Sequence, residues 1–452
     1  KGSRGVALCT HLENGCMRLS WALYITRALF KQTDCLRSAH FPAWLCPVRS
    51  GYESCKKSRD GLTMLVHHFL ECSASKLPCK TALICGQERW TYEQIDTRAE
   101  ELAVYFIALG AQRGDRVVLF LDNSPEAVIG MFASLKAGLI FVLLNSSMKA
   151  QKLRYILEDS GARFIVAQTS RQKILHAALS NINTVSSIIW CGNVKDEAET
   201  YSIKRNCILS KNWEEILVER SSSLPRVIDQ DLATIIYTSG STGEPKGVMS
   251  SHYNVVSAVK SISAYLKNTS EDIILNALPL SFDYGLYQIF MSFYVGGTVV
   301  LEKSFAYPYS VLKKIDRERV TGFPVVPTMA ALFLNLREMD KHSFSSLRYI
   351  TNTAATMPVK YIRKLQHDLP HVQIYCMYGL TECKRVSYLP PEYLHLKPES
   401  VGVPMPNCEA RVIKRNGEEA CPDEVGELVI RGCNVMQGYC NDPEATGRVF
   451  GK

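Results

Sequence analysis

The chain contains 452 residues, 46% of them hydrophobic and 21% charged, which is typical of a globular protein of two or more domains and excludes a disordered one. The formal net charge is +8, but the first 60 residues hold ten Lys/Arg against four Asp/Glu and account for +6 of it. The remaining chain lacks the basic excess expected of a nucleic-acid-binding protein, so no nucleic-acid partner is expected.

The first 62 residues differ in composition from the rest and stay unassigned, as a basic, cysteine-rich extension. No C-x-x-C zinc spacing occurs among their five cysteines, which are Cys9, Cys16, Cys35, Cys46 and Cys55. The most apolar run, WALYITRALF, is short and interrupted by Arg27, so no membrane span is predicted. The other eleven cysteines are scattered through apolar runs, as buried thiols are in a reducing compartment, and we expect a cytoplasmic protein.

From Thr63 onward, short β-rich runs alternate with helical patterns, which predicts a doubly wound α/β fold with mostly parallel strands and flanking helices. The run RVVLFL at 116–121 is typical of a buried strand. Ser124 and Pro125 then supply the N-cap and first-turn proline of a helix that ends at Gly138. The next runs repeat the alternation: LIFVLL, KAQKLRYILEDSG, RFIVAQ, RQKILHAALS and SSIIW.

The polar stretch Ser221–Arg226 is the best candidate for an internal boundary, because it continues neither a helical nor a strand period. The alternation resumes in IILNALPL, GTVVL, TGFPVVP, LRYITNT and VQIYCMYG. Near the end, EARVIK and GELVIRG predict hairpin strands, with Asn416-Gly417 as a turn signal. We therefore expect an α/β region over 63–405 and a β-rich region over 406–452.

The loop YTSGSTGEPKG (Tyr237–Gly247) follows the strand-like run LATII, and open α/β sheets bind ligands at the carboxyl ends of their strands. Its glycines let backbone N–H groups approach an anion, its hydroxyls add donors, and Lys246 adds a positive charge. It is not a P-loop of the G-x-x-x-x-G-K-[ST] type, because Gly247 follows the lysine. A flexible linker is the alternative, but a linker rarely ends in Pro-Lys-Gly, and we favour phosphate binding.

The spacing of this loop resembles that of the adenylate-forming (AMP-binding) superfamily, which includes AMP-forming acyl-CoA ligases and amino-acid adenylation domains. Three further stretches resemble other signatures of this family in the same order: Leu135–Asn145, Tyr378–Glu382 (YGLTE) and Gly426–Thr446. The resemblance implies that 63–405 is the AMP-binding α/β core and 406–452 its β-rich end. The family continues with a Thr-Gly-Asp motif and a C-terminal lid carrying a lysine, which do not occur before Lys452, so we expect a truncated core with weak turnover.

The resemblance also implies an ATP site with Mg²⁺. Lys246 and Glu382 would be catalytic, because Lys246 would offset charge on the leaving pyrophosphate and Glu382, with Thr238, would hold the metal. Tyr378 would stack on adenine and Thr381 would bind phosphate. The implied ATP-binding residues are Thr238, Ser239, Gly240, Ser241, Thr242, Gly243, Lys246, Thr353, Ala354, Ala355, Tyr378, Gly379 and Thr381.

The segment SFDYGLY should border the carboxylic acid substrate, with Phe282, Asp283, Tyr284 and Cys376 as candidate contacts. In amino-acid-activating relatives an aspartate after phenylalanine pairs with the substrate's ammonium group. The alternative is that Asp283 is a helix N-cap, and the sequence does not choose between the two. His252 matches a position where the family often has histidine, and we expect it to order a helix start.

These residues predict an AMP-forming acid–thiol ligase that adenylates a carboxylic acid with ATP and then transfers the acyl group to CoA. The first alternative is adenylation of an amino acid or other acid with loading onto the phosphopantetheine of a carrier protein. The second is a non-catalytic nucleotide-binding remnant. Identity of the acid cannot be predicted from the sequence.

Overall fold

The structure is a computed structural model that describes residues 64–192, 208–216, 223–239, 243–336 and 342–450, together with the backbone of Met17–Leu19. The predictions for Gly240, Ser241 and Thr242, and nearly all of the 1–62 extension, lie outside the described residues. Among those that are described, no helix is both long and apolar enough to cross a bilayer.

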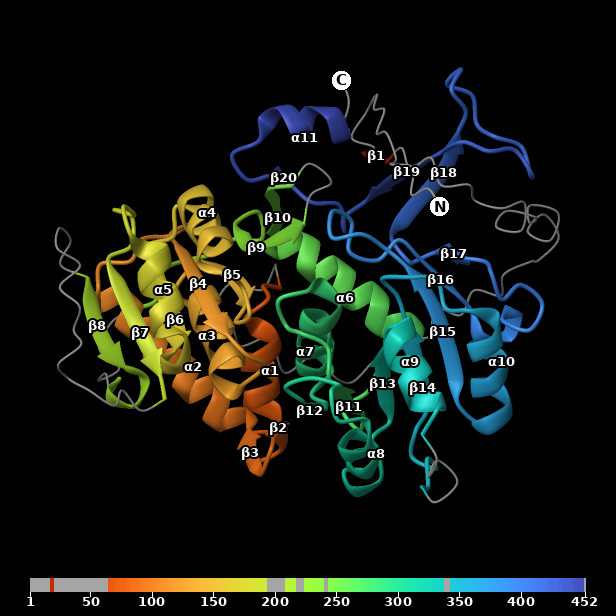
Figure 1. Cartoon of the computed structure of the whole chain (residues 1–452), viewed down its shortest axis with the longest axis horizontal. Coiled ribbons are helices and arrows are strands. Elements are labelled where there is room, and N and C mark those ends of the chain that lie inside the picture. The colour runs from red at the N-terminus through yellow and green to blue at the C-terminus, as the bar shows by residue number, and fades with distance from the viewer. Residues whose placement is uncertain are drawn as a thin grey trace.

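An eight-stranded sheet forms one half of the molecule (Figure 1). Its strands, in spatial order, are β20 (Gly438–Tyr439), β10 (Pro245–Ser251), β9 (Leu232–Ser239), β5 (Ile140–Asn145), β4 (Arg116–Leu121), β6 (Phe164–Gln168), β7 (Ser187–Cys191) and β8 (Leu209–Asn212). The strands from β9 to β8 run parallel, and β10 and β20 add antiparallel partners at one edge.

A nine-stranded sheet forms the other half. Its strands, in spatial order, are β17 (Val403–Pro404), β16 (Ser387–Leu389), β15 (Gln373–Tyr378), β14 (Tyr349–Asn352), β13 (Gly322–Val325), β11 (Ile273–Asn276), β12 (Thr298–Leu301), β2 (Thr81–Cys85) and β3 (Glu88–Thr91). Its central strands are parallel, and antiparallel pairs close both edges.

The helices cover both sheets, and one apolar core contains side chains from both of them. They are α1 (His68–Lys76), α2 (Tyr92–Ala108), α3 (Pro125–Lys136), α4 (Ala150–Ser160), α5 (Gln172–Leu179), α6 (His252–Leu266), α7 (Asp283–Val295), α8 (Pro308–Arg317), α9 (Pro327–Leu334), α10 (Val359–Asp368) and α11 (Pro443–Phe450). Side chains alternate across β4: Leu119 joins the core with α2 and α3, whereas Phe120 packs with α4 and α5. Phe132 of α3 stacks on Phe293 of α7, with ring centroids 5.3 Å apart, which ties the two halves together.

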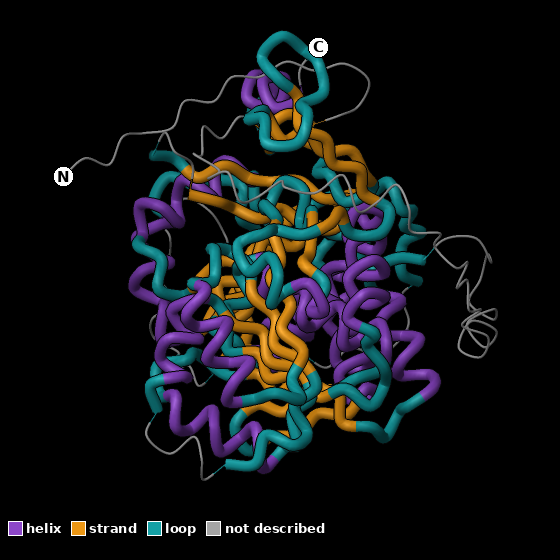
Figure 2. The backbone as a smooth tube through the Cα atoms, turned by 90° about the vertical axis from the view of Figure 1, so that its right-hand side faces the viewer, coloured by secondary structure: helices purple, strands orange, loops and turns teal. Residues whose placement is uncertain are grey.

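A small third sheet, two of whose strands come from near the end of the chain, lies above the body of the molecule in Figure 2. It contains β1 (Met17–Leu19), β19 (Glu427–Gly432) and β18 (Cys408–Ile413), all antiparallel. Asn416 and Gly417 form the predicted turn, where Gly417 has φ +87° and donates its amide to Lys414.

The predicted fold class is confirmed, including mostly parallel sheets and flanking helices. Ser124 caps α3 by accepting from the Ala127 amide at 3.3 Å, as its sequence position predicts. The stretch Ser221–Arg226 does not divide two sheets, because β9 after it pairs with β5 before it. β9, which follows this polar stretch, completes the sheet that begins before it. A local polar pattern contains no information about such a long-range pairing. The boundaries at residues 63 and 405 stay a prediction.

Candidate active site

The loop that resembles a phosphate-binding element is the turn of a hairpin between β9 and β10. β9 continues to Ser239, and Lys246 of β10 lies directly opposite Thr238, so their side chains share one face of the sheet. The sequence analysis missed β10, because a Pro, Lys, Gly and Ser-rich run lacks a strand period. Gly247 is required by packing: a Cβ there would lie 2.8 Å from Ile235 Cγ2.

Lys246 faces the β-rich end of the chain. Its Nζ lies 3.8 Å from Asp442 Oδ2 and 5.1 Å from the ring centroid of Tyr439. The Tyr439 hydroxyl in turn donates to Glu382 Oε1 at 2.7 Å. Burial, and then the Glu382 charge, raise the pKa of Tyr439, so this hydroxyl stays protonated and remains a donor. The two residues predicted to be catalytic are therefore connected through one tyrosine ring.

The loop 379–386 carries Glu382 and is held by tight backbone contacts. A Cβ on Gly379 would lie 2.1 Å from the Lys384 carbonyl oxygen, so only glycine permits this approach. Asn434 is fully buried and its Nδ2 donates to the carbonyl oxygens of Cys383 at 2.6 Å and Arg385 at 2.8 Å. The β-rich end thus fixes the position of this loop.

Two cations that the sequence analysis did not single out are buried in the same loop. Lys384 is 1% exposed, has φ +52° and donates from Nζ to the Thr381 carbonyl oxygen at 2.9 Å. Burial lowers the pKa of Lys384, and the charges of Asp283 and Glu382 oppose that change. Arg385 is 4% exposed, with its Cζ 4.7 Å from the ring centroid of Tyr284.

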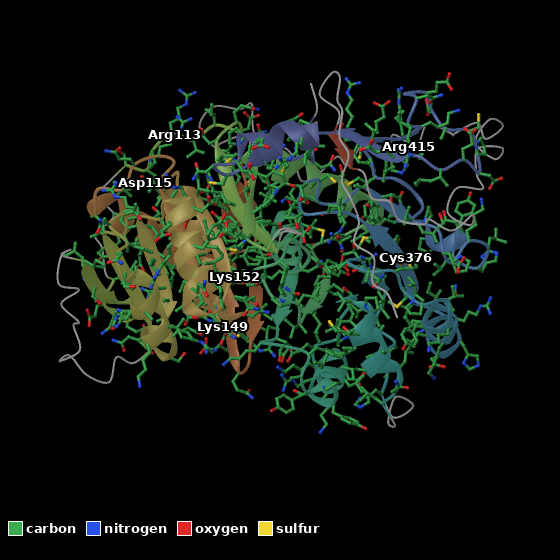
Figure 3. The ribbon with its side chains drawn as sticks, turned by 45° about the horizontal axis from the view of Figure 1, so that its top comes forward. Arg113, Asp115, Lys149, Lys152, Cys376 and Arg415 are labelled. Carbon is green, nitrogen blue, oxygen red and sulfur yellow. The ribbon has the colours of Figure 1, made fainter. Side chains whose placement is uncertain are left out.

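A cavity of about 230 Å³ lies at the carboxyl ends of β14 and β15. It brings together several residues predicted to bind ATP or substrate, and its wall contains Thr353, Ala354, Ala355, Cys376, Tyr378 and Gly379. Figure 3 marks Cys376 inside this half of the molecule, away from Arg415 on the outer turn of the small sheet. The cavity is smaller than the roughly 300–1,000 Å³ of sites for drug-sized ligands, and its size suits one ring system.

The chemistry of the cavity wall suits a polar ligand. The buried Oγ1 of Thr353 has no hydrogen-bond partner among the described residues. Burial raises the pKa of Tyr378 and of Cys376 to about 12 in each case, so both side chains are neutral. Ala354 has φ +72°, a conformation that costs a residue with a Cβ about 1–2 kcal/mol.

The predicted substrate residues do not share one environment. Tyr284 is buried and its hydroxyl donates to the Thr351 carbonyl oxygen at 2.7 Å. Phe282 is 56% exposed and occupies the N-cap position of α7. Asp283 is the first residue of α7 and makes no capping hydrogen bond, so the N-cap alternative is wrong. Its Oδ2 lies 3.8 Å from Arg385 Nη1 instead.

His252 is buried at the first position of α6 and its Nδ1 accepts from the Val66 amide at 3.1 Å. Burial lowers its pKa to about 4, which keeps the imidazole neutral. The contact with Val66 holds the segment before α1, whereas Ser251 and Asn254 cap the start of α6, so the expected role of His252 in ordering that start stays a prediction.

The residues present fit a divalent cation and a nucleotide. Glu382 is half-buried, and its Oε2 has no hydrogen bond to the described residues while Tyr439 fixes Oε1. A free carboxylate oxygen is a hard ligand of the kind that Mg²⁺ prefers. Thr238 and Lys246 lie on the hairpin, and Thr381 is half-buried in the Glu382 loop.

Comparisons with known proteins decide the family. The family model of AMP-binding enzymes matches residues 70–440. The chain belongs to the AMP-binding enzyme family.

Three relatives illustrate the range of this family. The long-chain-fatty-acid–CoA ligase of Bacillus subtilis is 29% identical over 402 residues, covering 84% of this chain and 71% of that protein. Surfactin synthase subunit 2 of Bacillus subtilis is 28% identical over 399 residues, covering 86% of this chain but 10% of that protein. The structure of VinN in complex with L-aspartate is 29% identical with a TM-score of 0.73, covering 85% of this chain and 92% of that one.

Four side chains of the site were missed from the sequence: Lys384, Arg385, Asn434 and Tyr439. Lys384 and Arg385 directly follow YGLTE at the end of a strand, and this position was a signal that they lie inside the site. Tyr439 and Asn434 lie within the downstream signature, but only the fold brings Tyr439 to Glu382 and Asn434 to the carbonyl oxygens on either side of Lys384.

Proposed function

We propose that this chain is the large core of an AMP-forming acid–thiol ligase. In the first step a carboxylate oxygen of the acid attacks the α-phosphorus of ATP, and the bond to pyrophosphate breaks. In the second step a thiol attacks the acyl carbon and AMP leaves with that carboxylate oxygen, while the thiol proton goes to solvent. CoA is the proposed thiol.

The observation that carries this proposal is the connection of Lys246 to Glu382 through Tyr439, beside a cavity at the carboxyl ends of β14 and β15. Such an edge of parallel strands is where α/β sheets bind nucleotides. Lys246 and Thr238 would contact the phosphates, and the cavity residues Ala354 and Tyr378 would hold adenine.

Each predicted group has a stated role in this proposal. Glu382 and Thr238 would hold Mg²⁺, which would neutralise phosphate charge when bound. Lys246 would stabilise the charge that develops on pyrophosphate, a contribution worth about a hundredfold or more in rate. Gly243 has φ +103° and would let the loop backbone approach the phosphates. Ser239, Gly240, Ser241 and Thr242 complete the proposed loop.

Loading of an amino acid onto a carrier protein remains the second candidate. Its support is the similarity to surfactin synthase subunit 2 and to VinN, which was solved with L-aspartate. The acceptor would then be phosphopantetheine. The third hypothesis, a non-catalytic remnant, has no such support, because these relatives are named as a ligase and a synthase subunit.

A pyrophosphate exchange screen tests the proposal. The chain, joined at Lys452 to the C-terminal part of the Bacillus subtilis ligase, is given ATP, labelled pyrophosphate and a set of fatty, aryl and amino acids. We expect exchange with at least one acid and thioester formation with CoA. Lys246→Ala should lower exchange about a hundredfold, while Lys360→Ala on exposed α10 leaves it unchanged. Lack of exchange with every acid would contradict the proposal.

We propose the cytoplasm as the compartment. Nine cysteines of the described part carry free thiols, whereas Cys72 is disulfide-bonded. The proposed partners are a small carboxylic acid and, for the second candidate, a carrier protein.

A further inference from the structure

Arg385 is a buried guanidinium that contacts two of the predicted substrate residues, Asp283 and Tyr284. It follows β15 in the chain yet contacts the start of α7, where its Nη1 is 3.8 Å from Asp283 Oδ2. That separation is an ion pair too long for a hydrogen bond. The face of the guanidinium packs on the Tyr284 ring, which leaves the N–H groups at its edge unused by the ring.

The donors of Arg385 lack acceptors. Its Nε is buried without a hydrogen-bond partner among the described residues, and no other hydrogen bond of this side chain to them is found. A buried donor without an acceptor is costly, and more so when it is charged. An oxygen-bearing ligand that reached this point would supply the missing acceptor.

A second buried group without a partner lies in the same environment. The hydroxyl of Tyr287, on the second turn of α7, has no hydrogen-bond partner among the described residues. Burial and the Asp283 charge raise the pKa of Tyr287, while the Arg385 charge opposes them, so all three groups lie within electrostatic range. A neutral hydroxyl and a guanidinium together offer donors to one oxygen-bearing group.

The charges around this point disfavour an ammonium ligand. Asp283 already faces Arg385, whose Nη1 lies 3.8 Å from Asp283 Oδ2. An ammonium group that approached Asp283 would meet the positive charge of the buried Arg385 side chain in a region of low dielectric constant. A carboxylate would meet the opposite balance.

We propose that Arg385 binds a carboxyl oxygen of the acid substrate and, with Asp283, selects acids that carry no ammonium group. This inference rests on the proposed function and narrows its substrate class to acids other than amino acids. The oxygen comes either from the reacting carboxyl group or from a second carboxylate on the acid.

The test measures binding to the chain itself by calorimetry. The ligands are AMP and three sulfamoyl-adenosine mimics of the acyl-adenylate with four-carbon acyl groups: butyryl, succinyl and 2-aminobutyryl. All three mimics have the same nucleotide and a four-carbon acyl chain. Relative to the butyryl group, the succinyl group carries a carboxylate in place of the terminal methyl, and the 2-aminobutyryl group adds an ammonium group at the second carbon. We expect the 2-aminobutyryl mimic to bind wild type about tenfold or more weakly than the butyryl mimic, the effect of one charged contact.

Arg385→Met separates the two sources of the oxygen. An equal loss, about tenfold or more, for the butyryl and succinyl mimics supports the reacting carboxyl group, and a loss for the succinyl mimic alone supports a second carboxylate. AMP affinity should not change, and Arg385→Lys should restore part of the loss. The inference is overturned if Arg385→Met changes the affinity for neither the butyryl nor the succinyl mimic. It is also overturned if the wild type binds the 2-aminobutyryl mimic more tightly than the butyryl mimic and Asp283→Asn weakens binding of the 2-aminobutyryl mimic.

Two controls keep these outcomes interpretable. Arg348→Met removes another arginine, which pairs with Asp272 at 2.8 Å near the opposite end of β14, and should leave all mimic affinities at the wild-type level. Asp283→Asn is the second variant, for use if Arg385→Met fails to fold, because asparagine has nearly the same shape as aspartate. It should not weaken binding of the 2-aminobutyryl mimic. If neither AMP nor any mimic binds the wild type, the proposed function itself fails. If the mimics bind with equal affinity, only the inference about Arg385 and Asp283 fails.

Discussion

Replacing Asn434 with alanine should loosen the loop that carries Glu382. Asn434 Nδ2 is the donor to two buried carbonyl oxygens, those of Cys383 and Arg385. Each buried acceptor left without a donor costs about 1–3 kcal/mol, and partial relaxation suggests about 2–4 kcal/mol in total. The amide of Val386, which donates to the Tyr378 carbonyl oxygen at 2.9 Å, reports on opening of this loop.

Amide hydrogen exchange followed by mass spectrometry measures the effect. Because 1.4 kcal/mol is a factor of ten, the Val386 amide should exchange about thirtyfold to several hundredfold faster in Asn434→Ala. Asn416→Ala is the matched control, since Asn416 lies in the exposed turn and its side chain donates only to exposed Glu418. Equal exchange rates in the two variants would refute the conclusion that the β-rich end fixes the loop.

The remaining predictions concern strain, pH and metal binding. Ala354→Gly should raise the free energy of unfolding by about 0.5–1 kcal/mol, because it relieves a positive φ, whereas the control Ala355→Gly should lower it; denaturant titration distinguishes them. Burial lowers the pKa of His252 to about 4, so its stabilising contribution is complete above pH 6.5 and falls as the pH drops towards 4. At pH 4.5 the free energy of unfolding should be lower by about 2.5 kcal/mol than above pH 6.5 on account of this group. His252→Gln should flatten this pH dependence in urea titrations. Tyr439→Phe frees Glu382 from its hydrogen bond and should raise the Mg²⁺ concentration for half-maximal pyrophosphate exchange about tenfold, whereas an unchanged Mg²⁺ dependence would contradict that role.

The sequence predicted those parts of the fold that depend on local patterns. β4 has the predicted bounds, and α3 begins at Pro125 after its serine cap, because hydrophobic period and capping residues are local signals. β10 was missed, since its pairing with β9 and β20 comes from tertiary contacts and its residues have low strand propensity.

The candidate site was predicted less completely for a similar reason. Motif spacing pointed to Lys246, Glu382 and the cavity wall. Lys384 and Arg385 were overlooked because charged side chains are rarely buried, and a binary pattern assigns them to the surface. Such departures from local rules concentrate at functional sites, and only the fold shows that these two side chains are buried.

The central claim is that the acid's own carboxylate attacks the α-phosphorus of ATP. Transfer of ¹⁸O tests it most directly. The chain joined at Lys452 to the C-terminal part of the Bacillus subtilis ligase is incubated with ATP, CoA and an acid labelled in both carboxylate oxygens, and mass spectrometry measures the masses of the products. We predict one ¹⁸O atom in AMP for each thioester formed and none in pyrophosphate. Thioester formation with unlabelled AMP, or with ¹⁸O in orthophosphate, would contradict the account.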